Sequence, residues 1–248
     1  MEKNGVDVDD LIFIDPDGQT AEELLQIILD LIDSDGIGLV VIDSIPALVS
    51  NQSMEKTLDE KTYAGISSVL STFSQKVLPK LSKHKCTLIG INQPRDDLSG
   101  YHQLISPGGR MWKHICFIRL LLRKGGYYDD TYKDLKAHPD EAYGNYSEVE
   151  VVKNKATKPD RHLTKFSISY DKGVDGYNDT FNMAVTMGII QKGGAWYSYE
   201  DENGNIKVDS EGNEIKWNGK SKAMEYLKEH NDTYTEIYNK VLESIEND

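Results

Sequence analysis

The stretch Gly38-Leu39-Val40-Val41-Ile42-Asp43-Ser44 decides the fold of this chain. Four consecutive apolar residues between a glycine and two polar residues predict a strand buried on both faces, as in a parallel sheet. A carboxylate at the end of such a strand lies where α/β sheets bind their ligands. Asp43 and Ser44 are therefore candidate ligand-binding residues, although an aspartate that only caps the turn after a strand produces the same local pattern.

The segments around this strand alternate between helical and extended patterns. Thr20 precedes an acidic first turn and apolar residues at helical spacing, which predicts a capped helix. The alternation predicts a parallel sheet covered on both faces, and the later strands, which have no long helix between them, predict an antiparallel edge. We expect strands at residues 11–15, 39–42, 86–91, 115–123, 148–153 and 165–170, and helices from Thr20 onward and over about 62–82.

The second half of the chain divides into three parts. Residues 125–146 are rich in Tyr, Asp, Lys and Gly and predict a surface insertion. From about residue 173 the pattern changes to a helix near 180–187, a hairpin at 195–215 and a last helix over 221–245. We therefore expect two domains, residues 1–172 and residues 173–248.

Composition restricts the class of protein. The chain carries 41 acidic and 28 basic residues, a net charge of −13, but the acidic excess lies at the two ends and the middle carries many Lys and Arg. A local basic surface is therefore compatible with a nucleic-acid partner. The apolar runs are too short to span a membrane and the first residues resemble no signal peptide, so we expect a cytoplasmic protein. Cys86 and Cys116 lie in apolar stretches that predict reduced core thiols.

A second polar strand end is predicted at Asn92-Gln93. An amide there can hydrogen-bond a nucleotide phosphate or its attacking water and lead into the adjacent loop, residues 94–107. Paired glycines at Gly108-Gly109 allow close approach to phosphates, and arginines and an aromatic ring would add charge and stacking. The loop residues concerned are Arg95, Tyr101 and Arg110. A long surface loop without a ligand is the alternative interpretation.

Two motifs that contain lysine could each bind phosphate, but the sequence supports this role for only one of them. Lys153 and Lys155 are separated by one residue of a predicted strand, so both side chains can meet one triphosphate, although a solvated strand edge has the same pattern. The triplet Gly219-Lys220-Ser221 imitates the end of a phosphate-binding loop. The first glycine of that loop would fall at Glu214, after a polar hairpin, so we expect only a turn and the start of the last helix.

Four stretches, in this order, resemble RecA/UvsX-type recombinases. Val40–Leu48 is similar to the family's Walker B strand and its exit. Gln93 begins a loop that ends at paired glycines, as the second DNA-binding loop of the family does. Val152–Lys155 has the family's Val-Lys-Asn-Lys pattern, and Gly193–Tyr199 resembles the entry to its C-terminal domain. The resemblance implies an α/β fold: a truncated RecA-like P-loop ATPase core with a mostly parallel sheet and an antiparallel edge, plus a small α+β C-terminal domain.

The resemblance also implies roles for individual residues. It implies ATP and Mg²⁺ as cofactors, with Asp43 on the metal side, Gln93 in catalysis, and lysines that reach the nucleotide of the neighbouring subunit. The implied nucleotide-binding residues are Asp43, Ser44, Lys113, Lys153 and Lys155. The implied DNA-binding residues are Thr72, Lys76, Arg95, Tyr101, Gly108, Gly109 and Arg110.

The implied function is homologous DNA recombination and repair. A filament would coat single-stranded DNA and pair it with duplex DNA in an ATP-dependent reaction. No Walker A loop or catalytic glutamate is found ahead of Asp43, so we expect a chain inactive alone and completed by an N-terminal polypeptide, or a truncated remnant. A phage-like recombinase is indicated by the insertion. The alternative is a non-catalytic DNA-binding or filament-modulating protein, and another RecA-fold ATPase such as a helicase loader is disfavoured.

Overall fold

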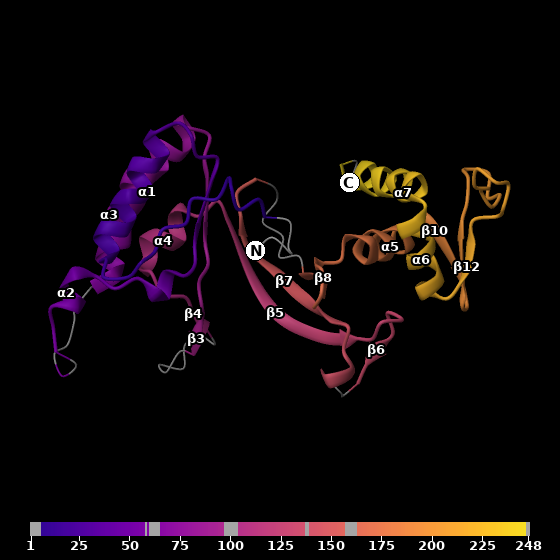
Figure 1. Cartoon of the computed structure of the whole chain (residues 1–248), viewed down its shortest axis with the longest axis horizontal. Coiled ribbons are helices and arrows are strands. Elements are labelled where there is room, and N and C mark those ends of the chain that lie inside the picture. Colours follow the sequence, from indigo (N-terminus) through magenta and orange to yellow (C-terminus); the bar gives the residue numbers. More distant parts are fainter. Residues whose placement is uncertain are drawn as a thin grey trace. The chain divides into compact units, whose positions relative to one another are not determined.

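The computed structural model describes residues 6–57, 59, 65–96, 104–136, 139–156 and 163–246. The chain forms two compact units, one of Ile12–Phe117 and the other of Met1–Leu11 with Ile118–Asp248. Figure 1 labels their helices and strands. This division separates two contact units, and the domain boundary after residue 172 remains a prediction.

Two helices form most of the core of the first unit. Helix α1 (Ala21–Asp33) starts at Thr20, whose backbone N–H donates to Glu23 Oε2 at 2.8 Å, while its hydroxyl accepts from the Glu23 N–H at 3.3 Å. This reciprocal capping confirms the predicted helix start. Helix α3 (Gly65–Lys83) packs beside α1. The buried residues of the two helices are Ala21, Leu25, Ile28, Leu29 and Ile32, and Leu70, Phe73, Ser74 and Val77.

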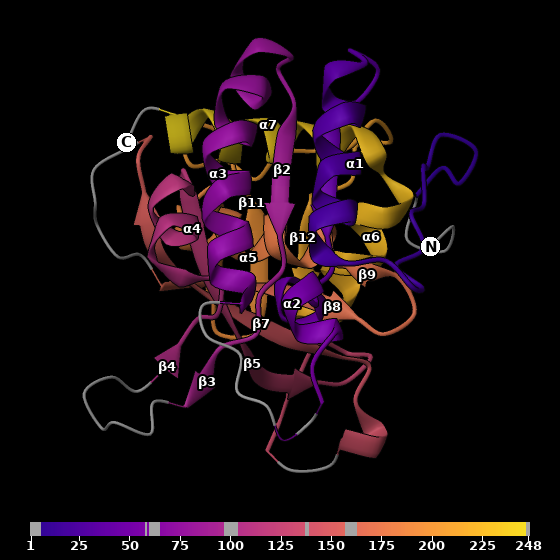
Figure 2. The same ribbon diagram turned by 90° about the vertical axis from the view of Figure 1, so that its left-hand side faces the viewer.

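The strands β1 (Leu39–Ile42) and β2 (Thr87–Gly90) form a parallel pair in this unit, as predicted. Ile42 joins the core of α1 and α3, and Figure 2 shows both helices running along β2. Val41 and Ile89 on the opposite side are 51% and 46% exposed. The prediction that helices cover both faces is therefore wrong for the described residues. The shorter elements are η2 (Ile45–Ala47), α2 (Asn51–Met54), β3 (Arg95–Asp96), β4 (Leu104–Ile105) and α4 (Gly109–Ile115).

The strand predicted at residues 11–15 does not form. Ile12 and Phe13 are 59% and 70% exposed, and they have no ladder partner among the residues described. A strand is defined by its neighbour, because its backbone groups need a ladder to bond to. Apolar residues alone were insufficient here.

An antiparallel sheet organises the second unit, in the order β6-β5-β7-β8-β9. It confirms the predicted antiparallel strands, although β5 begins three residues later than expected because helix α4 extends to Ile115. Among the described strands of the whole chain, parallel pairing is confined to β1 and β2. The strands are β5 (Ile118–Tyr128), β6 (Asp134–Leu135), β7 (Gly144–Asn154), β8 (Leu163–Ser169) and β9 (Gly173–Val174), with the turn η3 at Pro139–Glu141.

The segment 125–146 is built into this unit. Tyr128, Tyr132 and Tyr146 are buried in one apolar cluster together with residues of the C-terminal elements. The Tyr128 ring lies 5.8 Å from the Tyr132 ring and 5.1 Å from the Tyr146 ring. The prediction of a surface insertion is wrong for these tyrosines, because each contributes a large apolar ring to the core.

The C-terminal elements follow the predicted order, with one break. The last helix is divided at His230, whose ring stacks on Tyr226 at 3.8 Å. A second helix begins at Asn231, a residue type that favours helix starts. The elements are α5 (Gly176–Thr186), β10 (Ile190–Gly193), β11 (Trp196–Tyr199), β12 (Lys216–Asn218), α6 (Lys220–Glu229) and α7 (Asn231–Glu246). None of the helices in the described ranges is long and apolar enough to cross a bilayer.

The contact between β7 and β8 leads to a stability prediction. A Cβ atom at Gly144 would lie 2.2 Å from the Ile168 carbonyl oxygen and 2.5 Å from the Tyr128 hydroxyl. Gly144→Ala is therefore expected to lower the free energy of unfolding by about 1–3 kcal/mol through overpacking. Thermal unfolding followed by circular dichroism should show a lower Tm. The matched control is Gly126→Ala on β5, where a Cβ meets nothing within 4 Å; equal Tm values for the two variants would contradict the packing.

Candidate functional site

The parallel pairing of β1 and β2 places the carboxyl ends of both strands next to each other. We call this end of the two-stranded sheet its carboxyl edge. Asp43 follows β1 directly and is exposed, and the peptide bond from Asp43 to Ser44 is cis. Gln93 follows β2 and is also exposed. Beyond the strands, Ile91 N–H donates to Ile42 O at 3.0 Å and Ile45 N–H donates to Ile91 O at 2.9 Å. The structure therefore brings Asp43, Ser44 and Gln93 to the same edge, as the sequence predicts for strand ends.

Asn92 connects this edge to the segment that precedes α4. Its side-chain Nδ2 donates to the Pro107 carbonyl at 2.9 Å. Its Oδ1 is buried and has no hydrogen-bond partner within the described part of the chain. The link joins the end of β2 to the residues just before Gly108, so the two ends of the polar loop are held together.

The paired glycines have a packing role. Gly108 and Gly109 have φ values of 100° and 79°, in the left-handed region that favours glycine. A Cβ on Gly108 would lie 3.1 Å from Trp112, and one on Gly109 would lie 3.2 Å from Ser67 of α3. The turn into α4 is thus closely packed against α3, and glycine is required there whether or not a phosphate approaches.

The polar loop begins and ends as a short ribbon. Arg95 of β3 pairs with Ile105 of β4, an element that the sequence reasoning missed because two-residue strands have no periodicity. Arg95 and Arg110 are both exposed. Tyr101 lies outside the described residues. The structure thus supports a solvent-facing position for the two arginines.

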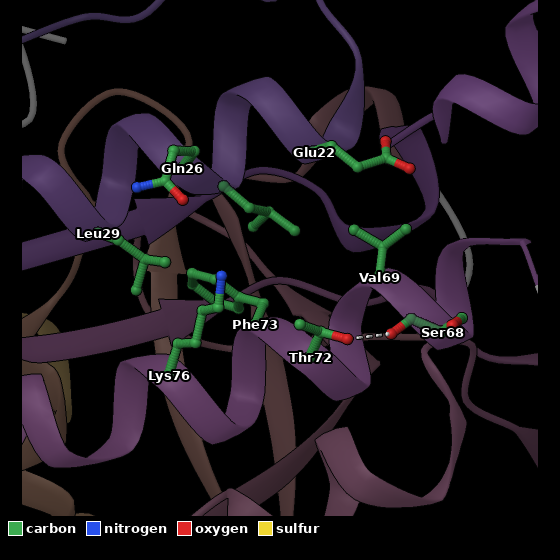
Figure 3. A pocket seen from close by; sticks show the side chains of 9 residues that line it. Glu22, Gln26, Leu29, Ser68, Val69, Thr72, Phe73 and Lys76 are labelled. Atoms are coloured by element: carbon green, nitrogen blue, oxygen red, sulfur yellow. Dashed lines mark hydrogen bonds between the residues drawn. The ribbon is translucent and has the colours of Figure 1, made fainter.

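Thr72 and Lys76 line a groove of about 300 Å³ between α1 and α3 (Figure 3). Glu22 and Gln26 of α1 line the opposite side, and Thr72 Oγ1 donates to Ser68 O within its own helix at 3.3 Å. The groove includes none of the strand-end residues described above. The apolar residues that line it are Leu25, Leu29, Val69 and Phe73. DNA contact by Thr72 and Lys76 remains a prediction, and a facing carboxylate does not favour phosphate there.

The motif Val152–Lys155 lies in the second unit. Lys153 is the next-to-last residue of β7 and pairs directly with Arg119 of β5. Lys155 follows the end of the strand, so strand alternation does not extend to it. Like charges placed directly across a ladder are unfavourable unless an anion offsets them. Lys113, partly buried on α4, belongs to the first unit.

Lys220 belongs to the triplet Gly219-Lys220-Ser221, which imitates the end of a phosphate-binding loop. Its side chain lies in a cluster of polar groups. Its Nζ donates to Asn182 Oδ1 at 2.7 Å and lies 5.6 Å from the Tyr132 ring centroid. Burial lowers the pKa of Lys220 to about 8, although the carboxylates of Asp175 and Asp179 act in the opposite direction. The expected turn and helix start at Gly219 are confirmed, and the lysine is bonded inside the protein.

The same cluster joins the C-terminal helices to the sheet. Asp179 accepts from the Ser167 N–H at 2.9 Å and from the Ser167 hydroxyl at 2.7 Å, and burial raises the pKa of Asp179. The Tyr132 hydroxyl donates to Asp175 at 3.2 Å and accepts from Lys228 at 2.9 Å. Sequence reasoning missed this network, because its members are separated by up to 96 positions in the chain.

The donor set at the strand ends fits one side of a magnesium nucleotide. Asp43 supplies a carboxylate, Ser44 a hydroxyl and Gln93 an amide, which are oxygen ligands or phosphate partners that Mg²⁺·ATP accepts. Across the described residues, no three or more His, Cys, Asp or Glu side chains gather around one point. Cys86 and Cys116 are free thiols, and burial raises the pKa of Cys86.

Parallel strands with polar residues at their carboxyl ends are features of α/β nucleotide-binding proteins. The RecA N-terminal domain family model matches residues 1–175, and the RecA C-terminal domain family model matches residues 178–205. The chain belongs to the RecA family.

Individual relatives are similar over nearly the whole chain. Protein RecA of Ruminococcus albus is 30% identical over 242 residues, which are 97% of this chain and 55% of that protein. Protein RecA of Lactococcus lactis subsp. cremoris is 33% identical over 96% of this chain and 57% of its own length. Protein RecA of Listeria welshimeri is 31% identical over 98% of this chain and 64% of its own length. The chain therefore spans 55–64% of the length of these relatives.

The polar cluster leads to a pH prediction. Lys220 has a pKa of about 8 in the folded chain and an ordinary value of 10.5 when unfolded, so the unfolded state binds more protons between these values. The contribution of Lys220 to the free energy of unfolding should therefore rise with pH across that window, by roughly 3 kcal/mol. Lys220→Met should remove this rise in urea unfolding measurements. Lys222→Met, at an exposed position of the same helix, is the control; identical pH slopes in both variants would contradict the prediction.

Proposed function

We propose that this chain acts in homologous DNA recombination and repair, as part of a RecA-type filament that binds single-stranded DNA and pairs it with duplex DNA. The observation that carries the proposal is the edge formed by β1 and β2, where Asp43 and Gln93 lie together. From this edge Asn92 reaches the segment before α4 through its bond to Pro107. This hydrogen bond therefore joins the proposed nucleotide site to one end of the proposed DNA-binding loop.

ATP and Mg²⁺ are the proposed cofactors. Asp43 is suited to orient the water shell of the magnesium ion, with Ser44 beside it, and Gln93 to bond the γ-phosphate or the attacking water. The 248 residues contain no GxxxxGK[ST] stretch, and Lys220 is bonded within the C-terminal part. Residues that cradle the β- and γ-phosphates must therefore come from polypeptide outside this stretch, and ATP turnover is proposed only together with it.

The link between the two functions is mechanical. A nucleotide contact that moves Gln93 acts on the adjacent Asn92, and the bond of Asn92 to Pro107 passes the displacement to the far end of the loop. Arg95 and Arg110, both exposed, would neutralise DNA phosphates at the two ends of that loop.

Lys153 and Lys155 are proposed to act on the nucleotide of a neighbouring subunit. Lys153 stands directly opposite Arg119 of β5, so this part of the sheet carries two neighbouring basic residues, whose side chains are of the kind that bind phosphate. Lys113 is proposed to act across the same subunit interface.

A second candidate function is a DNA-binding or filament-modulating protein without ATP turnover. The absence of a phosphate-binding loop from the 248 residues favours it. The two functions differ in one result: only the first predicts DNA-stimulated ATP hydrolysis after a phosphate-loop segment is supplied, and its loss in Asp43→Ala.

DNA binding tests the proposal directly. Arg95→Ala with Arg110→Ala is expected to reduce the slope of log affinity for single-stranded DNA against log salt by up to roughly two units, about one for each lost phosphate contact. Fluorescence anisotropy over a salt series measures the slope. Lys83→Ala with Lys85→Ala removes the same charge from exposed positions near the end of α3 and is the control. A slope unchanged by the arginine variant would place the DNA site elsewhere.

Subunit mixing tests the lysines in a reconstituted recombinase. Lys153→Ala with Lys155→Ala should abolish ATP-dependent filament assembly, because the phosphate contact is lost, and thermal unfolding of the variant checks that the chain still folds. Mixing this variant with Asp43→Ala should restore turnover at interfaces that combine two intact faces. Mixed filaments with no more turnover than either variant alone would disprove the role across the interface.

A further inference from the structure

Strand β8 of the second unit has a partly free edge. The strand pairs with β7 over its whole length, but with β9 only at Ile168 and Ser169. At the edge away from β7, the Ser167 N–H donates to Asp179 Oδ1 at 2.9 Å, and the Ser167 carbonyl accepts from the Asp175 N–H at 2.9 Å. Both backbone groups of Ser167 therefore point away from β7.

The backbone groups of Lys165 and Leu163 point the same way. In an antiparallel ladder the direction repeats at every second residue, and the register between β7 and β8 is continuous over these positions. None of these four groups has a hydrogen-bond partner among the residues that the structure describes. An edge with unpaired N–H and carbonyl groups can accept a further strand.

A groove of about 380 Å³ lies beside this edge, between the sheet and α5. The residues that line it include Tyr146 and Glu148 of β7, Lys165 and Ser167 of β8, and Asp179 and Met183 of α5. A groove between a strand edge and a helix suits an extended peptide, because the strand offers main-chain bonds and the helix offers side-chain contacts.

The groove has an acidic excess. Its charged side chains are the carboxylates of Glu148 and Asp179 and the ammonium group of Lys165. The Lys165 Nζ lies 4.4 Å from the centroid of the Tyr146 ring. Neither carboxylate forms an ion pair with a described residue, although Lys220 acts on Asp179 from a longer distance. Such carboxylates favour a cationic group on a ligand.

We propose that this groove binds an extended segment of a partner protein. The segment adds to the free edge of β8 and directs a lysine or arginine side chain toward Glu148 and Asp179. Every second side chain of an added strand faces the same way, so an apolar residue two positions away can contact Leu163 and Met183, which are 66% and 36% exposed. The surface contains none of the residues proposed to bind nucleotide or DNA, so the interaction is independent of the proposed function.

A display library of random heptapeptides, selected against the whole 248-residue chain without DNA or nucleotide, provides the probe. We expect the selected peptides to share one basic residue and an apolar residue two positions from it. The most frequent peptide is then synthesised, and its binding is measured by fluorescence anisotropy. Selected peptides that share an acidic residue, or no charged residue, would overturn the inference.

Two substitutions of Lys165 separate its backbone from its side chain. Both Lys165→Pro and Lys165→Ala remove the ammonium group, but only proline removes the outward N–H. Lys165→Pro should bind the peptide at least roughly fivefold more weakly than Lys165→Ala, because a peptide carbonyl loses its donor. The two variants should have similar Tm values, since this N–H is not part of the ladder with β7 and proline is tolerated at a strand edge.

The charge of the groove is tested at Glu148. Glu148→Gln should weaken binding by at least roughly threefold and reduce its salt dependence, because one carboxylate that faces the basic side chain is lost. Asp179 is left unchanged, since its bonds to Ser167 join α5 to β8. Glu225→Gln removes one carboxylate from an exposed position on α6 and should bind normally. Equal binding by the two glutamine variants would overturn the role of the charge.

Three further results would overturn the inference. They are the selection of no peptide, equal binding by Lys165→Pro and Lys165→Ala, and a much lower Tm in Lys165→Pro, which would mean that the N–H is bonded within the chain itself. A second copy of this chain is the alternative occupant. Self-association in sedimentation that disappears in Lys165→Pro would overturn the inference in its favour.

Discussion

The parallel register between β1 and β2 is the constraint on which the candidate site depends. Four residue pairs, from Leu39 with Thr87 to Ile42 with Gly90, run in the same direction, so both strands end at one edge. An antiparallel pair would have separated Asp43 from Gln93 by the length of the strand. Trp112 is buried close to the covered face, where a Cβ on Gly90 would lie 2.5 Å from its ring, and it brings α4 and the end of the polar loop to the same sheet.

The second unit is held together by different means. Its core contains several tyrosines, and partly buried polar groups join its elements: Asp179 of α5 bonds to Ser167 of β8, and Lys220 of α6 bonds to Asn182 of α5. Such networks cost free energy if a member is left without a partner, so they require one arrangement of the elements. The segment 125–146 takes part through Tyr132, which lies in this core.

Local sequence patterns predicted most of the helices and strands. They failed where an element depends on contacts with residues distant in the sequence. The capping box at Thr20 and the run Leu39–Ile42 contain their own evidence, since capping and continuous apolar character depend on adjacent residues. The strand expected at residues 11–15 needed a ladder partner. The last helix breaks at His230, where neither proline nor glycine marks the position. The candidate residues at strand ends were predictable for the same local reason, whereas the surroundings of Thr72 and Lys220 were not.

The sequence by itself determined that Asp43 and Gln93 end apolar strands, that Gly219-Lys220-Ser221 opens a helix, and that the chain resembles RecA-type recombinases. These conclusions rest on periodicity and on the order of short motifs, which a linear chain contains. Only the tertiary structure decided which face of the β1–β2 sheet is covered and which polar groups surround Lys220. Burial and partnership are properties of residues that are distant in the chain, and they exist only when the chain is folded.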